Sequence, residues 1–202
     1  MPKEKVKKGE TTRLAIEDAA ISLFMEQGYH ATSMRQIADR AGLALGGIYN
    51  HFASKDEIFS AIIMDKHPYK EILPIMQKIE AESAEEFIRQ AARALVTELG
   101  NRPDLLKLFF IELVEFNGKH IPKLLATVVP KILPIFEKLV HVRKNLRKFP
   151  PPVLVRSFIG MFFSYYFTEL LIKGSIAEQL APKNSFDLFV DIYLHGVVKE
   201  SA

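Results

Sequence analysis

Residues 33–51 constrain the fold of this chain most, because they have the pattern of two short helices joined by a tight turn. Apolar residues recur at the three- and four-residue spacing of a helix with one buried face: Met34, Ile37, Ala38 and Ala41. Ser33 and Gln36 have the spacing of a capping box, which satisfies free backbone N–H groups at a helix N-terminus. Gly42 follows where the chain must turn, and a residue without a Cβ turns there at little cost. We therefore predict a helix-turn-helix, with its second helix over 44–52.

Short motifs across residues 11–64 resemble the signature of the tetracycline-repressor (TetR) family. They are Thr32-Ser33, Ile37-Ala38, Ala41-Gly42, Gly46-Gly47-Ile48-Tyr49, His51-Phe52 and Ser54-Lys55-Asp56-Glu57. Their order and spacing across three helices are more specific than a lone helix-turn-helix pattern. The resemblance implies a DNA-binding transcriptional regulator whose second helix of the pair enters the major groove of double-stranded DNA. The rest of the chain resembles the family only in length and helical character.

The residues expected at DNA begin at the helix preceding the turn. Thr32 and Ser33 present hydroxyls and free N–H groups at a helix N-terminus, which suits a phosphate, although both residues also suit capping alone. Arg35 lies off the buried stripe, where it either reads a guanine or remains a phosphate contact or a surface charge. The resemblance implies phosphate contacts from three further residues: Tyr49, His51 and Lys55. The alternative for Lys55 is a solvated surface residue.

The recognition helix itself is unusual in its first residues. Ala44 cannot cap it, and Gly46 and Gly47 each lower helix propensity by roughly 1 kcal/mol. Small residues here let the backbone approach the bases, and Leu45 suits a thymine methyl group because Ile48 already faces inward. Asn50 faces either the groove or solvent. Direct readout by hydrogen bonds is therefore sparse, and readout of DNA shape would compensate.

The fold class expected is all-α, with a helix-turn-helix domain followed by a C-terminal helical domain. The predicted division is a flexible basic arm over 1–10, a DNA-binding domain over 11–66, and an effector-binding and dimerisation domain over 67–202. The arm either reaches DNA or only aids solubility. Besides the pair above, helices are predicted over 11–27, from Ser54 to near Pro68, and over 69–81, 84–99, 103–117, 121–143, 152–173 and 185–199. Prolines 74, 130 and 134 should kink or break their helices.

The C-terminal domain suggests a ligand pocket and a dimer interface. Glu112 lies on an apolar stripe, where it either meets a ligand or pairs with a Lys or Arg at the helix edge. Candidate pocket residues are Phe109, Glu112, Phe116, Phe136, Phe162, Tyr165 and Tyr166, although aromatics at helical spacing are more often plain core. The family typically pairs its last two long helices with those of a second subunit, which implies a homodimer. Candidate interface residues are Phe158, Phe186, Phe189, Tyr193 and Val197.

Composition excludes several other classes of protein. The chain has no cysteine, a net charge of +3 and no apolar signal segment, and Arg156 and Glu169 interrupt its one membrane-like stretch, Val153 to Ile172. We therefore expect a cytoplasmic protein with no membrane partner. Its six histidines are scattered and match no catalytic motif, so neither an enzyme nor a metal or other cofactor is expected.

The resemblance implies ligand-responsive repression. A homodimer would hold a roughly palindromic operator, and a small-molecule effector, largely apolar, would favour a conformation that releases DNA. The alternative is an activator or a DNA binder without an effector.

Overall fold

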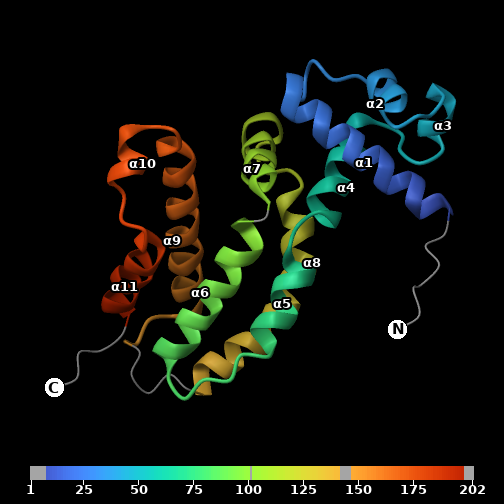
Figure 1. The fold of residues 1–202 in the computed structure, drawn as a ribbon. Helices are drawn as coiled ribbons and strands as arrows, with labels where there is room; N and C mark the ends of the chain where they lie inside the picture. The colour runs from blue at the N-terminus through green and yellow to red at the C-terminus, as the bar shows by residue number, and fades with distance from the viewer. Residues whose placement is uncertain (1–7, 101, 142–146, 198–202) are drawn as a thin grey trace. The chain divides into compact units, whose positions relative to one another are not determined.

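The structure is a computed structural model that describes residues 8–100, 102–141 and 147–197, and within these residues its regular structure is entirely helical (Figure 1). The helices are α1 (Lys8–Gln27), α2 (Met34–Arg40), α3 (Leu45–Tyr49), α4 (Lys55–Asp65), α5 (Tyr69–Gln77), α6 (Ala84–Gly100), α7 (Pro103–Phe116), α8 (Ile121–His141), α9 (Pro151–Ile172), α10 (Ile176–Leu180) and α11 (Ser185–Val197). The predicted all-α fold class is confirmed. Most of the predicted arm lies outside the described residues, and residues 8–10 belong to α1.

The chain forms two compact units, and their composition differs from the predicted division at residues 66 and 67. Of the described residues, the first unit contains 8–68 and 102–128, and the second contains 69–100, 129–141 and 147–197. Helix α7 and the start of α8 join the first unit because Phe116 stacks on Phe59 of α4, with ring centroids 4.7 Å apart. Sequence periodicity finds such helices but does not say which unit they pack in.

The core of the first unit forms between α1 and α4, which lie across one another in Figure 1. Its fully buried side chains include Ile16, Ala20, Ile37, Ile48, Phe52, Ile58, Phe59 and Ile62. Each large apolar side chain buried in this way contributes about 1.5–3 kcal/mol relative to exposure. The core therefore holds the helix-turn-helix on α1 and α4, as its apolar spacing predicts.

The local signals around the turn are confirmed in atomic detail. The Ser33 hydroxyl accepts a hydrogen bond from the Gln36 N–H (3.2 Å), and the Ser33 N–H donates to the Gln36 side chain (2.8 Å). Gly42 has φ +69°, and the following N–H, from Leu43, donates to the Ala38 carbonyl (2.9 Å). This bond pattern terminates a helix with a left-handed residue.

Helix α3 is shorter than the predicted range of 44–52. Ala44 is its N-cap and makes no side-chain capping bond, and the helix ends after Tyr49. Two glycines and an absent cap explain the short helix, because both disfavour helix initiation. Helix α4 starts with a capping residue, since the Ser54 hydroxyl accepts from the Glu57 N–H (3.1 Å).

The second unit is built from α5, α6, the later part of α8, and α9 to α11. Its buried core consists of Ala84, Ile88, Ala92, Phe162, Val190 and Leu194. Helices α5 and α8 continue through Pro74, Pro130 and Pro134, so the prolines do not break them. Helix α10 lies between the predicted helices 152–173 and 185–199, where the sequence predicted no helix, and the Ser175 hydroxyl caps it. No helix in the described part of the chain, α9 included, combines the length and hydropathy that crossing a membrane requires.

Candidate nucleic-acid interface

An exposed surface is formed by the start of α2, the turn after it, and α3. The predicted contact residues that are exposed there are Ser33, Arg35, Ala44, Leu45, Gly46, Tyr49 and Asn50, while Gly47 and His51 are half-buried. Ile48 is fully buried, as predicted. Leu45 and Tyr49 are large apolar side chains left exposed on a five-residue helix. Both side chains are therefore accessible to an approaching molecule.

The glycines of α3 have no structural requirement within the first unit. A Cβ at Gly46 would meet nothing within 4 Å, and a Cβ at Gly47 would meet only the Leu43 Cβ, at 3.9 Å. Neither glycine has a left-handed φ. Glycine at these positions therefore leaves space on the outer side of α3, where an approaching partner can lie close to the backbone.

Thr32 differs from the prediction, because its polar groups are not free. Its side chain is 2% exposed, and its hydroxyl donates to the Gly28 carbonyl (2.8 Å). Its N–H donates to the Tyr29 carbonyl (3.2 Å), and its hydroxyl accepts from the Gln27 amide (3.2 Å). Thr32 therefore closes the loop between α1 and α2, and the expected free hydroxyl and N–H at this position are wrong.

The Lys55 side chain bonds to backbone carbonyls of the α1–α2 loop, a contact that the sequence did not predict. Its ammonium donates to the carbonyls of Tyr29 and Thr32, at 2.5 Å each, and stands 4.2 Å from the centre of the Tyr29 ring. Burial lowers the pKa of Lys55, while the charge of Glu115 opposes that shift. The Lys55 ammonium is therefore held within the fold rather than fully solvated, and its phosphate contact stays a prediction. It ties the start of α4 to the α1–α2 loop.

An ion pair that the sequence pattern does not indicate joins α1 to α2. The Arg40 guanidinium binds the Glu26 carboxylate through two bonds, both of 2.8 Å. The pair is exposed, so solvent screens it and it contributes little to stability. The partners are fourteen positions apart, outside the three- and four-residue spacing through which a helix sequence reveals its pairs.

The candidate ligand residues are divided between the two units. In the first unit, Phe116 stacks on Phe59, and the buried Glu112 binds His120 rather than the predicted Lys or Arg. In the second unit, Phe162 belongs to the core, and the Tyr166 hydroxyl donates to the Val96 carbonyl (2.8 Å). The remaining candidates are Phe109 and Tyr165, which are half-buried, and Phe136, whose side chain lies outside the described residues.

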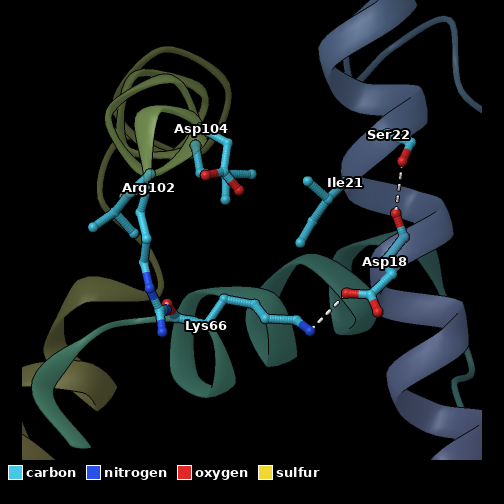
Figure 2. A pocket seen from close by; sticks show the side chains of 8 residues that line it. Asp18, Ile21, Ser22, Lys66, Arg102 and Asp104 are labelled. Atoms are coloured by element: carbon cyan, nitrogen blue, oxygen red, sulfur yellow. Dashed lines mark hydrogen bonds and ion pairs between the residues drawn. The ribbon is translucent and has the colours of Figure 1, made fainter. Parts of the chain in front are cut away.

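A cavity of about 400 Å³ lies in the first unit, at residues that the sequence did not single out as a pocket (Figure 2). It is lined by Asp18, Ile21, Ser22, Lys66, Arg102, Asp104, Leu105 and Leu108. The Lys66 ammonium pairs with the Asp18 carboxylate (2.7 Å), and the Arg102 guanidinium donates to the Lys66 carbonyl (2.8 Å). The cavity is therefore part apolar and part charged, and it borders α1, the end of α4 and the start of α7.

The predicted dimer residues largely face the core of the second unit. Phe158 contacts the rings of Phe162 and Tyr193, and the Tyr193 hydroxyl donates to the Leu154 carbonyl (2.9 Å). Phe186 packs on Phe162. The other candidates are Phe189, half-buried against Tyr165, and Val197, whose side chain lies outside the described residues.

A different set of apolar side chains is exposed on α9 and α11. It comprises Val153, Ile159, Leu170, Leu171, Leu188 and Ile192, of which Ile192 is 72% exposed. Phe158, Phe186 and Tyr193 contact core residues of their own unit, and their assignment to the dimer interface stays a prediction. A helix that is apolar nearly all round does not reveal which side faces its own core.

Comparison with known proteins places the helix-turn-helix in a family. Residues 16–62 match the family model described as bacterial regulatory proteins, tetR family. The HTH-type transcriptional activator FasR of Mycolicibacterium smegmatis is 47% identical over 45 residues, which are 22% of this chain and 20% of that protein. Curated relatives are matched over 20% to 54% of their own lengths, so the likeness covers less than two thirds of each.

Solved structures share the fold over nearly the whole chain. GusR of Salmonella enterica superposes with a TM-score of 0.72 at 18% identity, covering 95% of this chain and 98% of that one. A complex of triclosan with SmeT, the repressor of a Stenotrophomonas maltophilia multidrug efflux pump, has a TM-score of 0.67 at 22% identity, covering 95% and 93%. The helix-turn-helix of this chain therefore matches the model of the tetR family of bacterial regulatory proteins, and its described helices share the fold of these solved structures.

Proposed function

We propose that this chain is a DNA-binding transcriptional regulator that acts as a homodimer and represses transcription until a small molecule releases it. The observation that carries DNA binding is the outer side of α3, where Leu45 and Tyr49 are exposed beside two glycines that the fold does not require. Arg35, exposed one helix earlier, adds a positive charge without a hydrogen-bond or ion-pair partner among the described residues. A short helix with small and apolar residues suits contacts with thymine methyl groups and a close backbone approach.

Dimerisation is supported by the exposed apolar residues of α9 and α11. Ile159, Leu188 and Ile192 would lose their contact with water if a second copy packed against them, and each would contribute only the exposed part of the roughly 1.5–3 kcal/mol that full burial provides. A two-fold dimer presents two copies of α3 and would therefore favour a palindromic operator.

Release by a small molecule is supported by the cavity beside α1, α4 and α7. Its volume of about 400 Å³ lies within the range of ligand sites, roughly 300–1,000 Å³. A molecule bound there would contact the helices that hold the helix-turn-helix, and SmeT, a repressor of the same fold, is known in a complex with triclosan. The ligand alters DNA affinity only if it binds the two conformations with different affinities.

The experiment that tests DNA binding is selection of bound duplexes from a random pool by the purified full-length chain, repeated at two salt concentrations. An enriched palindrome is expected. Salt-sensitive binding without a motif would indicate a general DNA binder, because contacts with phosphates alone carry no sequence information. Failure to bind any duplex at low salt would refute the proposal.

A second candidate function is activation, since FasR is named a transcriptional activator. Repression and activation would use the same α3 surface, so a DNA-binding assay does not distinguish them. A reporter gene placed behind the selected site distinguishes them. Its transcript level should fall when this chain is expressed if the chain represses, and should rise if the chain activates.

A further inference from the structure

The cavity beside α1, α4 and α7 combines an apolar wall with charged side chains. Ile21 of α1 and Leu105 and Leu108 of α7 supply the apolar part, and Leu108 is almost fully buried. Figure 2 shows Asp104, at the start of α7, across the cavity from Ile21. A molecule in this space would therefore meet hydrocarbon and a carboxylate together.

The basic and hydroxyl groups that line the cavity are already bonded within the fold. The Lys66 ammonium pairs with the Asp18 carboxylate (2.7 Å), and the Ser22 hydroxyl donates to the Asp18 carbonyl (3.0 Å). The Arg102 guanidinium donates to the Lys66 carbonyl (2.8 Å), and Figure 2 shows this side chain extending toward Lys66 and away from Asp104. An anionic ligand would have to compete with Asp18 for the Lys66 ammonium, which offsets most of the free energy that it gains there.

The Asp104 carboxylate, by contrast, has no hydrogen-bond or ion-pair partner among the described residues. It lies half-buried in the first turn of α7, a position that by itself stabilises a carboxylate only weakly. Partial removal from water is costly for a charged group that lacks an internal partner. An ammonium ion would supply that partner through a hydrogen bond between two charged groups.

The neighbouring residues of α1 and α4 also favour a cation. Glu17, which precedes Asp18 on α1, is fully buried, and neither of its oxygens has a hydrogen bond among the described residues. Burial, followed by the negative charge of Asp65, raises the pKa of Glu17 to about 7, and the opposing effect of Lys66 is smaller than that of Asp65. At Glu17, therefore, Lys66 does not cancel the charge of Asp65.

The chemistry of the cavity suits an organic cation better than a metal ion. Within the part of the chain that the structure describes, no three histidine, aspartate or glutamate side chains are grouped to hold a metal. One carboxylate replaces little of the oxygen shell that a divalent ion requires. A protonated amine needs fewer polar partners, and its carbon atoms can pack on Ile21 and Leu105. The volume of about 400 Å³ lies near the lower end of the range of ligand sites, roughly 300–1,000 Å³, and therefore favours a short apolar body.

We propose that this cavity binds an organic ammonium ion, with its nitrogen on the Asp104 carboxylate and a short apolar body against Ile21, Leu105 and Leu108. The inference rests on the proposed function, because it names the chemical class of the small molecule expected at this cavity. A molecule with the same body and a carboxylate or hydroxyl in place of the ammonium lacks the ion pair with Asp104. It therefore binds more weakly.

The test is isothermal titration calorimetry of the purified full-length chain without DNA. Three probes share one alkyl chain and differ in their polar group: octylammonium, octanoate and octanol. Asp104→Asn keeps the shape of the side chain and removes its charge, and Ser22→Phe places a ring in the cavity from an exposed position. Asp187→Asn is the matched control, because Asp187 also lies in the first turn of a helix, α11, in the second unit.

Octylammonium should bind the wild-type chain at least about tenfold more tightly than octanoate or octanol. Asp104→Asn should weaken octylammonium binding by about tenfold, as expected when a hydrogen bond between charged groups is lost, and leave the affinity for octanol unchanged. Ser22→Phe should weaken the binding of all three probes, and Asp187→Asn should change none of them.

Tighter binding of octanoate than of octylammonium would overturn the inference, and so would equal octylammonium affinity in wild type and Asp104→Asn. Octylammonium binding that Ser22→Phe leaves unchanged would also overturn it, because the probe would then lie elsewhere. If Asp104→Asn fails to fold, the comparison of the three probes and Ser22→Phe decide.

A duplex titration with each probe tests the proposed function separately. Octanoate or octanol that releases DNA, while octylammonium does not bind the cavity, would support release by a small molecule and overturn the inference. Octylammonium that binds through Asp104 and leaves DNA affinity unchanged would support the inference and refute release from this cavity.

Discussion

Glu17 provides the sharpest test of the energetics of the first unit. It lies on α1 with a side chain that is 0% exposed, and neither of its oxygens has a hydrogen bond among the described residues. The Arg13 side chain approaches to 3.4 Å without completing one. Burial, followed by the negative charge of Asp65, raises the pKa of Glu17 from 4.5 to about 7, although Lys66 and Arg13 oppose the shift.

The direction and size of the effect on stability follow from this pKa. Because the folded chain holds the Glu17 proton more tightly than the unfolded chain, the free energy of unfolding is highest below about pH 4.5 and falls as pH rises to about 7. At about 1.4 kcal/mol per pKa unit, the loss amounts to about 3 kcal/mol. Above this interval the contribution is constant.

The assay is urea unfolding followed by circular dichroism, at several pH values between about 4.5 and 8. Glu17→Gln keeps the size of the side chain and removes the charge, so its free energy of unfolding should rise relative to wild type by about 3 kcal/mol across the interval. Glu80→Gln, at an exposed position, is the matched control and should follow the wild-type profile. Parallel profiles for wild type and Glu17→Gln would refute the reasoning.

Three further predictions concern the interface and the contacts that support it. Gly46→Ala should raise the free energy of unfolding by up to about 1 kcal/mol through helix propensity, which thermal melting would measure. The same change should weaken DNA binding in a duplex titration. Unchanged affinity would show that DNA does not approach the backbone closely at this position. Lys55→Met should lower the free energy of unfolding by about 1–3 kcal/mol, because buried carbonyls lose their donor, but leave the salt dependence of DNA affinity unchanged. A flatter salt dependence of DNA affinity in Lys55→Met would instead show that Lys55 contacts a phosphate. Ile192→Glu should split the dimer in analytical ultracentrifugation while Glu80→Gln does not, and a surviving dimer would place the interface elsewhere.

Local sequence was sufficient wherever the interacting groups are a few residues apart. The Ser33 capping box, the left-handed Gly42 and the uncapped start of α3 were all predicted, since each depends on the residue itself or on a neighbour three or four positions along the chain. The buried Ile48 follows from the same periodicity. The helix-turn-helix was therefore readable from the sequence alone.

The partners of two charged side chains, Lys55 and Glu112, were not predicted because they lie outside the three- and four-residue spacing of a helix. Lys55 was expected at phosphates, yet its ammonium reaches carbonyls 23 and 26 residues earlier. Glu112 was expected to meet a ligand, or a Lys or Arg, and its partner is a histidine brought back by two left-handed residues. Neither contact joins residues at a helical spacing, so neither can be recognised from sequence periodicity.

The sequence by itself determined the helices, their caps and the exposed α3 surface, because helix periodicity and capping act over short distances along the chain. Only the tertiary structure decided which apolar side of α9 and α11 is left exposed, that α7 joins the first unit, and that Glu17 and His120 are buried beside other charges. The physical reason is that burial and electrostatic interaction depend on distances in space. A periodic pattern identifies the apolar face of a helix but does not identify the residues that pack against that face.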